Sequence, residues 1–181
     1  MRVPADPQTG PNFRRQGAII LSLFALIWAM AGASGIGDGI AFWGIGAFAL
    51  AVTVGAIALA VRTESTRTAP RHLPPDWQRQ YNIVGIVQGV AILVAIAALV
   101  SLGAQGLIPP VVCFIVGLHF LPLERTFDQP EYRATALALC GVAVIGAGLL
   151  SFTSDEAVRA VVGFGAAVVL WGTAIVVTRT G

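Results

Sequence analysis

Two long apolar runs joined by a short turn occupy residues 79–125, which read RQYNIVGIVQGVAILVAIAALVSLGAQGLIPPVVCFIVGLHFLPLER. An arginine stands at either end of this stretch, and neither run, 83–102 or 107–123, contains an acidic or basic residue other than one histidine. A helical residue rises about 1.5 Å, so about 20 residues cross a hydrocarbon core of roughly 30 Å. The stretch therefore predicts a helical hairpin that crosses a membrane and returns.

Four further apolar runs extend this pattern over most of the chain. The six runs have 17 to 22 residues each and cover residues 17–33, 40–61, 83–102, 107–123, 134–152 and 157–177. With 56% hydrophobic and 11% charged residues, the 181-residue chain lies outside the composition of soluble proteins. The runs are continuous rather than alternating, which argues against membrane β-strands. We expect an all-α polytopic membrane protein with six transmembrane helices arranged as three helical hairpins. This single domain covers residues 16–181 and follows a cytoplasmic tail, residues 1–15.

The basic residues predict the orientation of the helices. All eleven are arginines, and ten of them belong to the termini and to alternate connections between the runs. These ten are Arg2, Arg14, Arg15, Arg62, Arg67, Arg71, Arg79, Arg125, Arg133 and Arg179. Basic loops close to membrane segments stay in the cytoplasm. We therefore expect a bacterial inner-membrane protein with both termini cytoplasmic, and Arg159 on the other side.

The arginines also mark a threefold pattern. An arginine opens each hairpin, and an Arg-Thr pair closes it after a nearly equal interval, at residues 62–63, 125–126 and 179–180. Either a repeat of one ancestral hairpin or the common length of any membrane hairpin with cytoplasmic ends produces this regularity. All three hairpins share one orientation, unlike the inverted repeats of many carriers.

His119 is the strongest candidate for a functional side chain. It is the only histidine in an apolar run, and helix rise places it roughly 9 Å from Arg125 into the inner half of the membrane. Pro122 cannot donate a backbone hydrogen bond, so it is expected to bend or end the helix and to free a carbonyl group. Polar groups in hydrocarbon face other helices and find partners there. Gln88 lies at a matching depth, and His119, Gln88 and Pro122 form the candidate intramembrane polar site.

This polar site has two interpretations. It is either a small binding site or proton-responsive group, or a set of hydrogen bonds that fixes the register of the helices. Ser22, Thr53, Cys140 and Thr173 are expected at the same depth, and for them the second interpretation is favoured.

Two further groups of residues belong to this hypothesis. Glu124, Arg125 and Tyr132 are expected at the cytoplasmic rim of the site, where an arginine can reach the membrane surface and pair with a carboxylate. Gly85 and Gly89 form a G-x-x-x-G frame, which permits close approach of helices. Both glycines are therefore expected to pack against another helix.

Several chemistries lack the residues they need. The chain has no Walker or dinucleotide fingerprint. Cys113 and Cys140 lie in apolar runs without a CxxC or zinc spacing. Apart from Arg14 and Arg15, the arginines stand singly, mostly at helix ends and near acidic residues, which does not suit nucleic-acid binding. The sequence therefore assigns no catalytic residue, no cofactor, no metal site and no nucleic-acid partner.

The segment Gly-Leu-His-Phe-Leu-Pro-Leu at residues 117–123, followed by Pro-Glu-Tyr at 130–132, resembles a pattern in uncharacterised small six-helix bacterial inner-membrane proteins. The resemblance covers little more than residues 117–132. It implies the fold and the location, and it carries no activity. Its contribution is to direct attention to His119, Pro122 and Tyr132.

Three classes of function remain open. The leading prediction is a protein without enzymatic chemistry that handles or transports a small solute, ion or lipid. The first alternative is a non-catalytic structural or accessory subunit, in a homo-oligomer or a larger membrane complex. The second alternative is a membrane-embedded enzyme that acts on a lipid or quinone. The lipid bilayer is the expected partner in all three.

Overall fold

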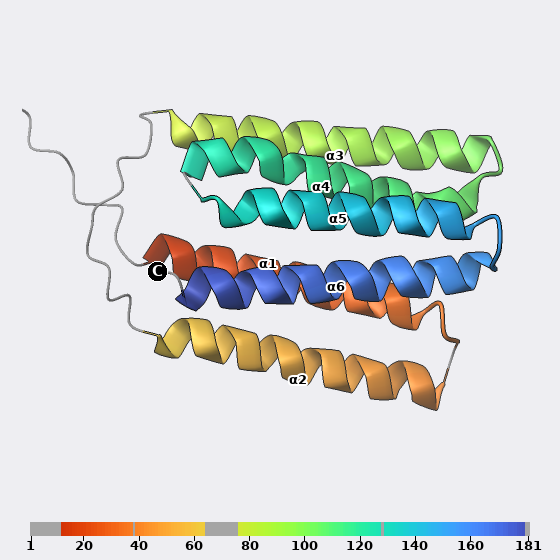
Figure 1. The fold of residues 1–181 in the computed structure, drawn as a ribbon, viewed down its shortest axis with the longest axis horizontal. Helices are drawn as coiled ribbons and strands as arrows, with labels where there is room; N and C mark the ends of the chain where they lie inside the picture. The colour runs from red at the N-terminus through yellow and green to blue at the C-terminus, as the bar shows by residue number, and fades with distance from the viewer. Residues whose placement is uncertain (1–11, 38, 64–75, 128, 180–181) are drawn as a thin grey trace, which may run out of the picture.

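Six long α-helices form the protein in the computed structural model, which describes residues 12–37, 39–63, 76–127 and 129–179 (Figure 1). They are α1 (Asn12–Ala33), α2 (Ile40–Arg62), α3 (Trp77–Ser101), α4 (Ile108–Phe127), α5 (Glu131–Leu149) and α6 (Asp155–Arg179). Each is long and apolar enough to cross a membrane. The predicted all-α fold with six spanning helices is confirmed, and the protein is a multi-pass membrane protein. Residues 1–11 of the predicted tail lie outside the described residues, and residues 12–15 belong to α1.

Short connections join the helices into three antiparallel hairpins. The turn after α3 contains Gly103 in the left-handed region, with φ of 68°, a conformation that only glycine adopts without steric cost. A short 3-10 helix, η1 (Gln105–Leu107), then leads into α4. At the start of α6, the hydroxyl of Ser154 accepts a hydrogen bond from the amide of Ala157 at 3.4 Å. Ser154 therefore caps the N-terminus of α6.

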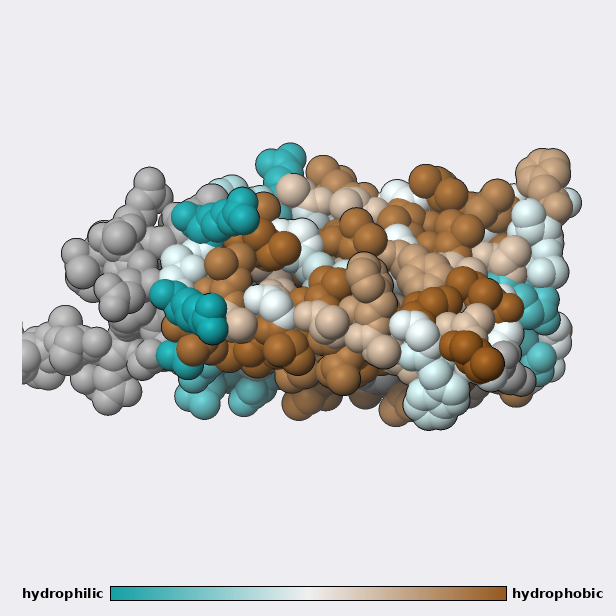
Figure 2. Space-filling model, turned by 90° about the horizontal axis from the view of Figure 1, so that it is seen from below, coloured by the Kyte–Doolittle hydropathy of each residue, from teal (hydrophilic) through white to brown (hydrophobic). Residues whose placement is uncertain are grey.

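Most arginines of the described residues gather at one end of the bundle. We call this the arginine-rich end; it holds Arg15, Arg62, Arg79, Arg125, Arg133 and Arg179. Figure 2 shows that polar residues concentrate towards the ends of the molecule, whereas apolar residues cover its flank. Large apolar side chains around the bundle are strongly exposed, for example Leu93 on α3 at 69%. Such a belt suits contact with acyl chains.

The closest packing joins helices of different hairpins. α1 packs most extensively against α6, and α4 against α5. α2 rests on α1 and α6 at one edge of the bundle, while α3 rests on α4 at the opposite edge (Figure 1). This separation accounts for the long connection that the chain needs between Arg62 and Trp77.

Small residues bring α1 and α6 together. On each of the two helices, buried residues follow one another at alternating intervals of four and three residues, as in the seam of a coiled coil. They are Ala18, Ser22, Ala25, Ala29 and Gly32 on α1, and Gly163, Ala167, Leu170, Ala174 and Val177 on α6. A Cβ atom added to Gly32 would lie 3.0 Å from the backbone nitrogen of Phe164. The two backbones therefore touch where no side chain intervenes.

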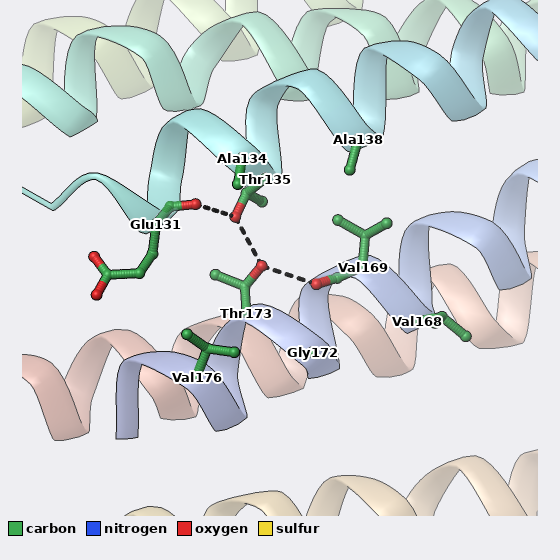
Figure 3. Close-up of a pocket in the computed structure, with 9 residues that line it drawn as sticks. All are labelled: Glu131, Ala134, Thr135, Ala138, Val168, Val169, Gly172, Thr173 and Val176. Atoms are coloured by element: carbon green, nitrogen blue, oxygen red, sulfur yellow. Dashed lines mark hydrogen bonds between the residues drawn. The ribbon is translucent and has the colours of Figure 1, made fainter. Parts of the chain in front are cut away.

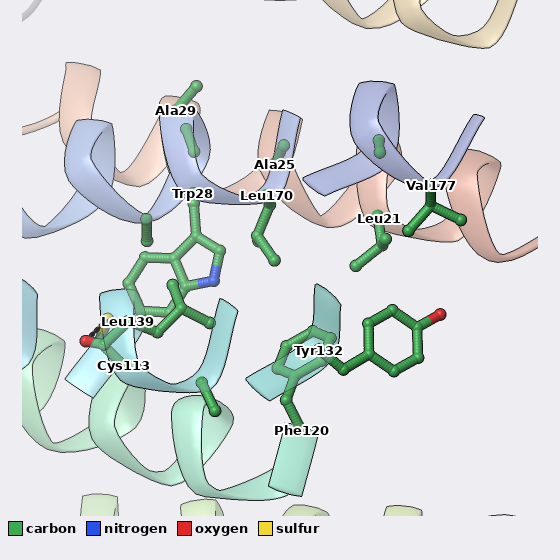
Figure 4. Close-up of a cluster of buried hydrophobic side chains, with 14 of the residues drawn as sticks. Leu21, Ala25, Trp28, Ala29, Cys113, Phe120, Tyr132, Leu139, Leu170 and Val177 are labelled. Carbon is green, nitrogen blue, oxygen red and sulfur yellow. Dashed lines mark hydrogen bonds between the residues drawn. The ribbon is translucent and has the colours of Figure 1, made fainter. Parts of the chain in front are cut away.

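A similar seam joins α4 to α5 and completes the core. A Cβ atom at Gly117 would lie 2.8 Å from the sulfur of Cys140, so only glycine fits there. Larger side chains fill the space between the two seams: Trp28 comes from α1, Leu139 from α5 and Leu170 from α6 (Figure 4). α3 contributes no buried residue to this core.

The predicted packing role of Gly85 and Gly89 is wrong for contacts within this chain. Both glycines are exposed, and a Cβ atom added to either would have no neighbour within 4 Å. α3 instead turns an adjacent face to α4: Gln80 accepts a hydrogen bond from Thr126, and Trp77 packs against Phe127 at 6.2 Å between ring centroids. A G-x-x-x-G frame allows close approach but does not determine which face is used.

The α1–α6 seam predicts opposite effects for two glycine substitutions. Gly163→Ala should destabilise the bundle by about 1–3 kcal/mol, because its methyl group would collide with the backbone of Gly32. Gly89→Ala should be neutral or stabilising by up to about 1 kcal/mol, because it gains helix propensity in open space. Thermal unfolding of both variants in the same detergent checks the difference. Equal stability would contradict the seam.

Candidate functional site

His119 lies on α4 at the seam with α3, in the half of the bundle that ends at the arginine-rich end. The side chain is half-buried, and its ring approaches the backbone of Val84 on α3. Its Nδ1 atom is buried and has no hydrogen-bond partner among the described residues. The edge of the ring lies against Phe120, with 5.9 Å between centroids. The imidazole thus faces a neighbouring helix, and one of its nitrogens remains unsatisfied.

Gln88 and Pro122 surround His119 less closely than the sequence predicted. Gln88 lies on α3 one turn beyond Val84 and is half-buried, and no hydrogen bond joins it to His119 within the described chain. Pro122 does not end α4, which continues to Phe127. The carbonyl of Pro122 lies 3.0 Å from the hydroxyl of Thr126 and is an alternative acceptor to Gln80 for its one proton. The expected pair of His119 and Gln88 is therefore replaced by contact of His119 with the α3 backbone.

The predicted rim separates into two environments. Glu124 is half-buried and Arg125 is exposed. Tyr132 does not belong to a rim, because only 6% of its surface is exposed. Its ring packs against that of Phe120, with 5.5 Å between centroids. Its hydroxyl lies close to Gly17 on α1, because a Cβ atom added to Gly17 would be 3.3 Å from the hydroxyl oxygen. Tyr132 is a core residue that links α1, α4 and α5.

The other polar residues expected at the depth of His119 do not join it. Ser22 donates to the carbonyl of Ala18 on its own helix. The indole of Trp171 on α6 donates to Thr53 on α2 at 3.1 Å. Thr173 on α6 lies 2.7 Å from Thr135 on α5, oxygen to oxygen. For Thr53 and Thr173 the structure shows hydrogen bonds between helices, in agreement with the interpretation that they fix helix register.

A groove between α5 and α6 is a second candidate that the sequence did not indicate. It has a volume of about 300 Å³ and is lined by Glu131, Ala134, Thr135, Ala138, Val168, Val169, Gly172, Thr173 and Val176. Figure 3 shows its two walls, with the paired hydroxyls of Thr135 and Thr173 between them. Neither His119 nor Glu124 lines this groove. The sequence could have indicated this groove only through small residues spaced so that they face each other on two helices. A single apolar run does not show which of its residues face another helix.

Comparison with known proteins gives no family for this chain. No family model, no curated protein and no solved structure matches it. Within the described residues, no group of three or more His, Cys, Asp and Glu side chains is arranged to hold a metal ion. The site hypotheses therefore rest on the geometry of the chain itself.

The Thr135–Thr173 pair predicts a measurable energetic coupling. Each hydroxyl also lies within hydrogen-bond distance of a carbonyl on its own helix, at 3.0 and 2.8 Å, yet each has only one proton to donate. Single Thr→Val substitutions should therefore cost little, and the double variant should show a coupling of about 0.6 kcal/mol, the average for hydrogen bonds between membrane helices. A double-mutant cycle by thermal unfolding measures it. The control cycle replaces Thr173→Val by Thr178→Val, since the hydroxyl of Thr178 donates to Ala174 within α6. Equal coupling in both cycles would contradict the hydrogen bond between Thr135 and Thr173.

Proposed function

We propose that this protein handles a small solute, ion or lipid at a polar site around His119, without enzymatic chemistry. The observation that supports the proposal is the buried, unpartnered Nδ1 atom of His119 on the α3–α4 seam. A buried polar atom without a hydrogen bond costs free energy, and polar side chains at membrane depth usually mark a functional site. Water or a ligand supplies the missing partner under this proposal.

The position of His119 also supports access for a small ligand. α3 contributes no buried residue, and its contacts within the described chain are mainly with α4. It is therefore the helix that separates from its neighbour with the least loss of packing. Small movements of α3 would open the seam at Val84 and His119 without disturbing the α1–α6 and α4–α5 seams.

A non-catalytic accessory subunit is the second candidate function. It is favoured by the exposed face of α3, where Gly85 and Gly89 leave open space beside the helix backbone. Such a face suits close approach of a helix from another protein. Under this alternative, His119 serves only to hold α3 against α4.

The stability of His119 variants separates the two candidates. If His119 is retained for ligand handling, His119→Leu should be at least as stable as the wild type, because it removes an unsatisfied buried group that costs about 1–3 kcal/mol. His119→Gln keeps polar groups and should not exceed the leucine variant in stability. Thermal unfolding in detergent provides the measurement.

A second readout reports directly on the missing partner. In a His72→Asn variant, His119 is the only histidine, and its ring nitrogens are observable by ¹⁵N NMR in lipid nanodiscs. Exchange of the ring protons with water is expected. A protected ring, together with marked destabilisation of His119→Leu, would contradict the proposal and favour the accessory role.

We further propose a bacterial inner membrane as the location, with the arginine-rich end in the cytoplasm. The support is the concentration of arginines at that end, since basic residues near membrane segments remain in the cytoplasm. Cysteine-accessibility mapping of intact cells should leave Ser65→Cys unlabelled and should label Ser34→Cys. Labelling of Ser65→Cys from outside would contradict this orientation and indicate the opposite one.

A further inference from the structure

The groove between α5 and α6 opens on the surface that faces the membrane. Its α5 wall extends from Glu131 to Ala138, about 12 Å by helix rise. Val168 is 65% exposed and Val176 is 43% exposed, so the wall on α6 borders the surroundings of the bundle. In a membrane, acyl chains of the bilayer would therefore contact the groove.

Small residues on both walls give the groove its depth. Ala134 and Ala138 on α5 are exposed. On α6, a Cβ atom added to Gly172 would have no neighbour within 4 Å. The floor contains Val169 and the Thr135–Thr173 pair. The lining is mainly apolar, and a volume of about 300 Å³ suits a thin unbranched chain better than a helix, whose diameter with side chains is about 10–12 Å.

Opposite charges stand where the groove reaches the arginine-rich end. The carboxylate of Glu131 lies at this end of the groove (Figure 3). Arg179 is exposed and follows Val176 by three residues on α6, which places both on one face of that helix. A guanidinium group pairs well with phosphate, and a carboxylate accepts hydrogen bonds from an ammonium group. The groove thus combines an apolar channel with two charges of opposite sign at the membrane surface.

We propose that this groove binds one phospholipid whose zwitterionic headgroup carries a primary amine. One acyl chain lies between α5 and α6, Arg179 contacts the phosphate, and Glu131 contacts the ammonium group. The charge pattern selects this class among bilayer lipids. A purely anionic headgroup would be repelled by Glu131, and a quaternary choline group has no N–H to donate to the carboxylate.

Native mass spectrometry of the full-length protein tests this proposal. The protein is released from nanodiscs that contain equal amounts of phosphatidylethanolamine, phosphatidylcholine and phosphatidylglycerol, and the retained lipids are counted. One bound phosphatidylethanolamine is expected, enriched about tenfold over phosphatidylcholine, as a hydrogen bond to a charged group predicts. In Glu131→Gln, phosphatidylethanolamine and phosphatidylcholine should be retained in about equal amounts.

Groove-filling variants identify where the lipid binds. Gly172→Leu should abolish the bound lipid without a steric clash, and Ala138→Leu, from the opposite wall, should do the same. The matched control is Gly55→Leu on α2, which is exposed and equally open but lies outside the groove; it should retain the lipid. Size-exclusion chromatography confirms that each variant remains monodisperse.

Three results would overturn the proposal. Equal lipid retention by Gly172→Leu and Gly55→Leu would show that the groove is not the site. Preferred retention of phosphatidylglycerol would show general attraction to the arginines instead. Unchanged selectivity in Glu131→Gln would remove the role of the carboxylate. None of these results bears on His119, because the groove and the α3–α4 seam share no residue.

Discussion

Gly32 on α1 and Gly163 on α6 meet backbone to backbone, and the arrangement of the other helices follows from that contact. In hydrocarbon, apolar side chains gain little by leaving lipid for protein, so helices associate through close packing and hydrogen bonds. Buried residues at alternating intervals of four and three, most of them small, allow such packing from Ala18 to Gly32 on α1 and from Gly163 to Val177 on α6. α5 packs on α6 and α4 on α5, while α2 and α3 occupy the edges.

Polar side chains follow the same constraint, because hydrocarbon supplies no water to satisfy them. Thr53, Thr135 and Thr173 find partners on other helices or on their own backbone. His119 differs from them, since its buried Nδ1 atom has no partner in the part of the chain that the structure describes. Its place on the α3–α4 seam, beside the most exposed helix, makes it the polar group that a ligand would reach with the least disturbance of the core. This contrast is the basis for the proposed handling of a small solute, ion or lipid.

The two proposed sites use different helix pairs in the same half of the molecule. His119 lies between α3 and α4, whereas the groove lies between α5 and α6 and ends at Glu131. Both sites lie near the arginine-rich end, where charged headgroups and water are available. A bilayer lipid in the groove would occupy a lateral surface, and a ligand at His119 would occupy a seam.

The sequence by itself determined the class, the helix number and the alternation of arginines, because run length and charge are properties of single segments and the bilayer sets the length each segment needs. The polar character of His119 was also readable, since a lone histidine in an apolar run is conspicuous in any context. The contact partner of His119 could not be predicted in the same way, because helix rise indicates depth but leaves rotation about the helix axis open. Gln88 was therefore expected where the Val84 backbone lies. Gly85 and Gly89 were misassigned for the same reason, and Tyr132 was placed at a rim although it is buried. Only the tertiary structure decided which helices become neighbours. The α1–α6 seam and the α5–α6 groove each need two faces from distant parts of the chain, and no single segment specifies the face it presents.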